Sequence, residues 1–114
     1  MSEKRYDLEE RTFIFARDCR RLIKSLTMDI CNLEDGKQLV RSSGFVGANY
    51  IEANEALSKK DFRYRIKVCR KESMESKYWI QLLESSNENI KGFSTLEKEA
   101  DELIKIFSTI LKNS

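Results

Sequence analysis

The stretch from Arg41 to Ala53 separates small and apolar residues from bulky and polar ones when it is placed on a helix. At about 100° per residue, one face collects side chains that allow a second helix to approach closely. These residues are Gly36, Leu39, Ser43, Val46, Gly47, Tyr50, Asn54 and Leu57. The opposite face presents Arg41, Phe45, Asn49 and Glu52. One packing face and one aromatic-polar face predict a helix with a neighbour on each side.

Three other stretches repeat apolar residues at steps of three and four, which is typical of core-facing helices. We expect helices over residues 8–26, from about 32 to 57, from about 58 to 84 and from about 94 to 112. Short connections between four such helices predict an all-α, antiparallel up-down-up-down four-helix bundle, with residues 1–114 as one domain. Its predicted core includes Phe15, Leu22, Tyr50, Ile66, Ile80, Leu103 and Phe107.

Three of these helices are expected to begin with capping boxes, in which a short polar residue precedes an acid by three positions. The pairs are Asp7 with Glu10, Ser58 with Asp61, and Ser94 with Glu97. The second helix has a weaker signal, Asn32 with Asp35. It also contains three glycines, and each lowers helix propensity by about 1 kcal/mol relative to alanine. We therefore expect these glycines to mark close helix approach.

Several classes of protein are disfavoured by what the sequence lacks. There is no apolar run near 18 residues, so we expect no membrane span, and no apolar signal core follows Met1. We expect a cytoplasmic protein. There is no histidine, and the three cysteines have no CxxC spacing. Cys19 and Cys69 are expected to be small core residues. We predict no metal site, no cofactor and no catalytic residue.

An enzyme would have to rely on the carboxylates of Glu52, Glu72 and Glu75. Di-iron carboxylate bundles pair such residues with histidine, which this chain lacks. Ion pairing with Arg41, Arg65 or Lys71 is the favoured explanation.

The charge of the chain is unevenly distributed although its total is only +2. Residues 58–71 contain seven basic residues and one acid, a net charge of +6, whereas residues 72–89 contain one lysine and four glutamates, a net charge of −3. On a helix, six of the cations share a face away from the apolar stripe: Lys59, Lys60, Arg63, Lys67, Arg70 and Lys71. Such a patch is typical of phosphate binding, but it also fits a solvated surface.

Four sets of short motifs span nearly the whole chain. They are Tyr6-Asp7-Leu8-Glu9 with Phe15-Ala16, Gly36-Lys37-Gln38-Leu39-x-Arg41-Ser42, Val46-Gly47-Ala48-Asn49-Tyr50-x-Glu52-Ala53, and Phe62, Lys67, Lys71-Glu72, Glu75 and Tyr78-Trp79. Together they resemble a bacterial four-helix-bundle family that includes proteins encoded by intervening sequences inside 23S ribosomal RNA genes. Phe45 departs from the pattern, because the family more often has a small polar residue there.

The resemblance implies a homo-oligomer, with a pentamer favoured, and a connection to nucleic acid. Relatives of the family include the accessory protein of diversity-generating retroelements, a basic pentameric barrel that works with a reverse transcriptase. The expected oligomer interface combines the outer face of the second helix with part of the third: Arg41, Phe45, Asn49, Glu52, Glu72, Glu75 and Trp79. For Trp79, closing the edge of the bundle core is the alternative.

Two functions remain open beside the disfavoured enzyme. The first is a non-enzymatic homo-oligomeric accessory protein that binds RNA or DNA through its backbone. The second is an oligomeric protein–protein interaction module that binds no nucleic acid. Neither function requires a membrane.

Overall fold

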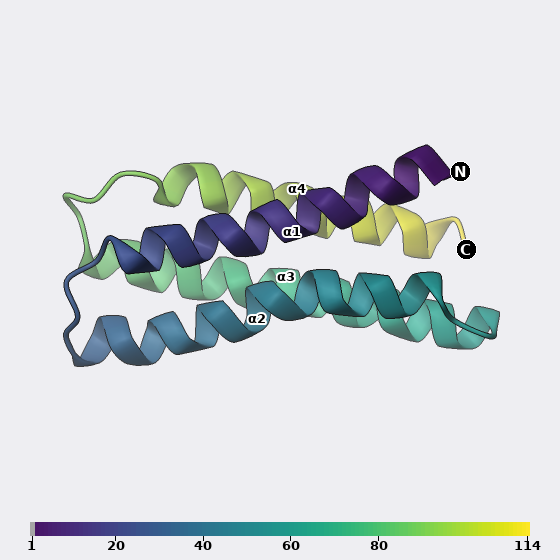
Figure 1. Cartoon of the computed structure of the whole chain (residues 1–114), viewed down its shortest axis with the longest axis horizontal. Helices are drawn as coiled ribbons and strands as arrows, with labels where there is room; N and C mark the ends of the chain where they lie inside the picture. Colours follow the sequence, from purple (N-terminus) through teal and green to yellow (C-terminus); the bar gives the residue numbers. More distant parts are fainter. Residues whose placement is uncertain (1) are drawn as a thin grey trace.

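A computed structural model describes the backbone of residues 2–114 and the side chains of residues 7–114. It contains four helices: α1 (Ser2–Lys24), α2 (Ile30–Asn54), α3 (Lys59–Ser86) and α4 (Phe93–Lys112). Consecutive helices run in opposite directions, and both termini lie at the same end of the bundle (Figure 1). Residues 2–114 contain no strand. The predicted all-α, antiparallel four-helix bundle is confirmed.

The four helices are not packed equally. α2 contacts α3 most extensively, and α3 also packs along α4. α1 rests mainly on α2 and makes few contacts with α4. The elongated bundle measures 44 × 22 × 19 Å. α1 is therefore the helix that depends most on a small number of specific contacts.

The ends of the helices were predicted with mixed success. Ser58 accepts a hydrogen bond from the Asp61 backbone N–H at 3.0 Å, as the capping box predicted. The cap at Asp7 was wrong, because α1 begins at Ser2 and Asp7 lies inside it. The cap at Ser94 was also wrong. α4 begins one residue earlier, after Gly92, whose φ of 111° is in the left-handed region that favours glycine.

The second helix is displaced towards the N-terminus relative to its predicted range. Asp29 is its N-cap and accepts a hydrogen bond from the Asn32 backbone N–H at 2.8 Å. The helix ends at Asn54, so the expectation that Leu57 lies on the packing face was wrong. Leu57 follows the helix and is fully exposed. Asn32 is instead buried in the first turn of α2 and exchanges side-chain hydrogen bonds with Asn87 at 3.0 and 2.8 Å, which joins the start of α2 to the C-cap of α3.

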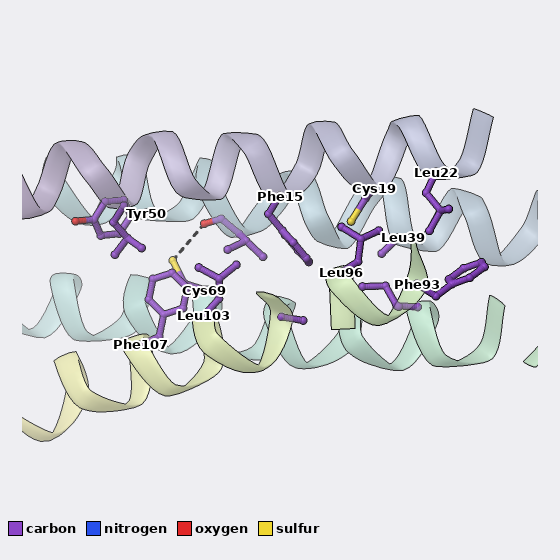
Figure 2. Packing of buried hydrophobic residues seen from close by; sticks show 14 of the residues in the cluster. Phe15, Cys19, Leu22, Leu39, Tyr50, Cys69, Phe93, Leu96, Leu103 and Phe107 are labelled. Carbon is purple, nitrogen blue, oxygen red and sulfur yellow. Dashed lines mark hydrogen bonds between the residues drawn. The ribbon is translucent and has the colours of Figure 1, made fainter. Parts of the chain in front are cut away.

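All seven predicted core residues are buried. Figure 2 shows labelled side chains from all four helices, among them Phe15, Tyr50 and Phe107, in one apolar cluster. The rings of Tyr50 and Phe107 lie 6.2 Å apart. Cys69 donates a weak hydrogen bond to the Val46 carbonyl at 3.4 Å, so the thiol is held between α2 and α3. None of the helices in the described residues has the length and apolar character needed to cross a bilayer.

Close approach of α1 and α2 occurs at the glycines, as predicted. A Cβ on Gly47 would stand 2.9 Å from the Thr12 hydroxyl oxygen, and one on Gly36 would meet Ile23 at 3.4 Å. α1 is also tied to α4 by a bidentate ion pair. The Arg11 guanidinium donates to the two carboxylate oxygens of Glu99 at 2.7 and 3.0 Å. This planar pairing is among the stronger side-chain interactions, and it joins two helices that otherwise touch little.

Candidate nucleic-acid interface

Only part of the basic surface of α3 faces directly away from the core. Lys60 and Lys67 are exposed on the side of the helix opposite Ile66 and Cys69, which have no exposed area. Lys59 is exposed at the first residue of the helix, although it lies two turns before Ile66 on the same face, and Arg70 is half-buried. These four cations have no ion-pair partner among the described residues, so their charges are available to a ligand.

Arg63 differs from its neighbours because its guanidinium contacts the end of α4. One nitrogen donates to the Leu111 carbonyl at 2.8 Å and to the Ser114 carbonyl at 3.2 Å. The last carbonyls of a helix lack intrahelical partners and bear partial negative charge. Arg63 therefore fastens the C-terminus of α4, and its replacement would disturb more than the basic surface.

Lys71 forms ion pairs near the boundary between α2 and α3. Its ammonium lies 3.7 Å from Glu75 and 3.8 Å from Glu72. Glu75 in turn lies 4.0 Å from the Arg41 guanidinium on α2. The ion pairing that the sequence favoured over a catalytic carboxylate cluster is present for these residues. The described residues contain no group of three or more His, Cys, Asp or Glu placed to hold a metal ion.

Glu72 is the most unusual charged residue in the described part of the chain. It is only 3% exposed, and its Oε1 is buried with no hydrogen-bond donor among the described residues. Burial, followed by the nearby Glu75 carboxylate, raises the pKa of Glu72. Ser76, one turn along α3 from Glu72, does not donate to it, because its hydroxyl pairs with that of Ser42 at 2.8 Å. Burying a carboxylate oxygen without a donor costs free energy of folding. From the sequence, Glu72 was assigned to the expected oligomer interface.

The outer face of α2 forms a compact aromatic-polar surface. The Arg41 guanidinium lies over the Phe45 ring at 5.1 Å, and Phe45 remains 43% exposed. Asn49 donates to the Phe45 carbonyl and accepts from Arg65 of α3 at 3.2 Å. Glu52 is exposed one turn further along. These residues form one continuous patch on α2.

Trp79 and Tyr78 mark the other aromatic region of α3. Trp79 is half-buried and packs against the core cluster. This position matches the edge-of-core alternative. Tyr78 is 57% exposed, and its ring meets Trp79 edge to face with a centroid separation of 5.0 Å.

A further set of exposed residues on α3 was not predicted as a site. Tyr64, Met74 and Tyr78 are 58%, 55% and 57% exposed. Together with Lys60, Lys67 and Lys71 they form one series along α3, with steps of four and three residues. Their spacing is visible in the sequence, but they carry no charge and so do not belong to the basic patch.

A surface groove of about 1070 Å³ follows the line between α1 and α2. Its floor includes Gly44, Gly47 and Ala48, and Phe13 of α1 contributes an apolar wall. The Phe13 side chain is 68% exposed. Arg20 borders the groove and is fixed there by a hydrogen bond to the Val40 carbonyl at 3.1 Å.

The cysteines offer no reactive thiol in the core. Cys19 and Cys69 are fully buried, as predicted, and burial raises the pKa of each thiol to about 12. A thiol with such a pKa is a poor nucleophile at neutral pH. Cys31 is exposed.

Comparisons with known proteins agree on the family. Residues 4–109 match the family model described as 23S rRNA-intervening sequence protein. A similar solved structure is that of a protein of unknown function from the S23 ribosomal protein family of Bacteroides thetaiotaomicron. It is 26% identical to this chain and has a TM-score of 0.79, and the match covers 91% of this chain and 97% of that one. None of the curated proteins matches the chain.

Proposed function

This chain belongs to the 23S rRNA-intervening sequence protein family, and from that premise we propose that it is a non-enzymatic, homo-oligomeric accessory protein that binds RNA or DNA by the phosphate backbone. The observation that supports this most strongly is the set of exposed lysines Lys59, Lys60 and Lys67 on α3, which have no ion-pair partner among the described residues. Lys60 and Lys67 project from the side of the helix opposite the core. Lysines held in this way can neutralise several phosphates at once.

Assembly of several chains would increase the affinity. On α3 of one chain, about four cations lack an ion-pair partner within the described part of the chain, and this number of phosphate contacts gives weak binding at physiological salt. A ring of identical chains repeats the patch, so a strand held by one subunit meets the next at high effective concentration. We therefore expect nucleic-acid binding to depend on the oligomeric state.

The test is retention of labelled RNA or DNA, measured by fluorescence anisotropy in about 50 mM salt. The double variant Lys60→Glu/Lys67→Glu should lose binding and keep its helicity and mass. These residues suit the test better than Arg63, which also holds the end of α4. The matched control is Lys98→Glu, an exposed lysine on α4 that lies off the patch. Equal binding by the wild type and the double variant would contradict the proposal.

The second candidate is an oligomeric interaction module that binds a protein instead. The exposed Phe45 ring under the Arg41 guanidinium supports it, because aromatic and arginine side chains are enriched at interfaces. Light scattering on the wild type and on Phe45→Asp tests this surface. Loss of the oligomer in Phe45→Asp, but not in Leu57→Asp at a fully exposed control site, would assign self-association to the α2 face.

A further inference from the structure

The outer face of α3 carries lysines interspersed with two tyrosines and a methionine. Lys60, Tyr64, Lys67, Lys71, Met74 and Tyr78 follow one another at steps of four and three, and all are exposed. We call these six residues the outer stripe. At 1.5 Å per residue the stripe is about 27 Å long, and its two tyrosines are about 21 Å apart. It contains three cations and no acid.

The tyrosines of the outer stripe are held in place rather than free to fold back onto the bundle. The Arg65 guanidinium lies over Tyr64 at 5.6 Å from the ring centroid. The edge of Tyr78 meets the half-buried Trp79. Each ring keeps more than half of its side chain exposed despite these contacts. Such rings lose little conformational entropy when a planar group stacks on them.

We propose that the outer stripe binds single-stranded nucleic acid, with bases stacked on Tyr64 and Tyr78 and phosphates at Lys60, Lys67 and Lys71. This inference rests on the proposed function and specifies its ligand. Aromatic platforms between cations are the usual means of holding a single strand without reading its sequence. In a duplex the base faces are covered by their neighbours, so the tyrosines would have nothing to stack on.

The positive charge of the outer stripe disfavours direct contact between the α3 helices of two copies of this chain. In two antiparallel copies aligned on the outer stripe, the central Lys67 of each copy would lie opposite Lys71 of the other. The stripe holds no acid to offset these like charges, which are destabilising. A strand with one negative charge per nucleotide is complementary to the same row. Lys71 already pairs with Glu75, so the strand would compete with that carboxylate for it.

The fluorescence of Trp79 can report on binding at Tyr78, because Trp79 is the chain's single tryptophan and contacts the Tyr78 ring. A single-stranded oligonucleotide of about 12 nucleotides is titrated into the wild type as RNA and as DNA, and a duplex of the same length is titrated in parallel. Both single strands should change the Trp79 emission at low salt. The duplex should leave it unchanged even where anisotropy reports phosphate binding. An equal emission change with the duplex would overturn the inference.

Substitutions distinguish the contribution of base stacking to binding affinity from the contribution of lysine charge. Tyr64→Leu and Tyr78→Leu keep apolar bulk but lose the ring, so each should weaken single-strand binding by about 5- to 150-fold without altering duplex binding. Lys60→Glu/Lys67→Glu should weaken both. The control Phe13→Leu, an exposed aromatic on α1, should change neither.

The outcomes distinguish the two claims. If both tyrosine variants bind single strands as the wild type does, stacking is refuted while the proposed function stands. If the wild type binds neither strand nor duplex, both claims fail. A change in oligomeric mass caused by Tyr64→Leu or Tyr78→Leu would assign the outer stripe to subunit contact and would also overturn the inference.

Discussion

The hydroxyl of Thr12 occupies the space that a methyl group on Gly47 would need, since a Cβ built on Gly47 stands 2.9 Å from Thr12 Oγ1. Thr12 cannot easily move away. It is 1% exposed, and its hydroxyl donates to the Leu8 and Glu9 carbonyls at 2.9 and 3.0 Å. This contact sets how closely α1 lies on α2, in a bundle where α1 has few other neighbours.

Gly47→Ala should therefore destabilise the protein although alanine is the better helix former. The propensity gain is about 1 kcal/mol, and overpacking costs about 1–3 kcal/mol, so we expect a net loss of about 1 kcal/mol in urea unfolding. Adding Thr12→Ala should recover part of the loss in a double-mutant cycle. Gly44→Ala is the matched control, because its Cβ would meet only the far end of the Arg20 side chain at 3.1 Å, and that end needs to shift by only a few tenths of an ångström. Equal effects of the two alanines would contradict this account.

Leu103→Ala should lower the free energy of unfolding by about 2–5 kcal/mol, because a fully buried leucine leaves a cavity. Leu57→Ala, at a fully exposed leucine outside the helices, should change it by less than about 0.5 kcal/mol. Chemical denaturation followed by circular dichroism measures both. A small loss at Leu103 would show that the core is not packed as described.

Glu72→Gln should stabilise the protein at neutral pH and change its pH dependence. Burial raises the pKa of Glu72 above its value in the unfolded chain, so the folded state binds the proton more tightly. The stability of the wild type relative to the variant is therefore greatest below the unfolded pKa of 4.5 and declines as pH rises through the folded pKa.

Denaturant melts of the wild type and Glu72→Gln between about pH 4 and pH 7 measure this difference. Glu102→Gln is the control, because Glu102 is exposed and pairs only loosely with Lys105 at 4.0 Å. A constant difference between wild type and Glu72→Gln across the range would refute the role of the buried charge.

The periodic features of the sequence predicted the fold well, and features that depend on neighbours were predicted poorly. Stripes at steps of three and four predicted the four helices, and all seven residues predicted for the core are buried, because burial of an apolar face dominates helix packing. The helix ends depend on single hydrogen bonds. Asp7 and Glu10 have the spacing of a capping box, but Glu3, Lys4 and Arg5 before them are good helix formers. α1 therefore extends through these residues to Ser2.

In the candidate site too, features set by spacing and charge were predicted, whereas features set by neighbouring helices were not. The basic face of α3 followed from spacing and charge alone. The role of Arg63 at the end of α4 and the burial of Glu72 did not, because both depend on which helices become neighbours. Tyr64 and Tyr78 had a visible spacing signal, but exposure of an aromatic ring cannot be distinguished from partial burial until the packing of α3 against α2 and α4 is known.

The most direct test of the central claim is the salt dependence of single-stranded RNA binding by the wild-type protein, measured by fluorescence anisotropy. With about four phosphates neutralised per chain, affinity should fall by about 50-fold or more between 50 and 200 mM salt. In Lys60→Glu/Lys67→Glu, binding should be lost at 50 mM. Absence of binding by the wild type at 50 mM, or an affinity that does not change with salt, would contradict the account.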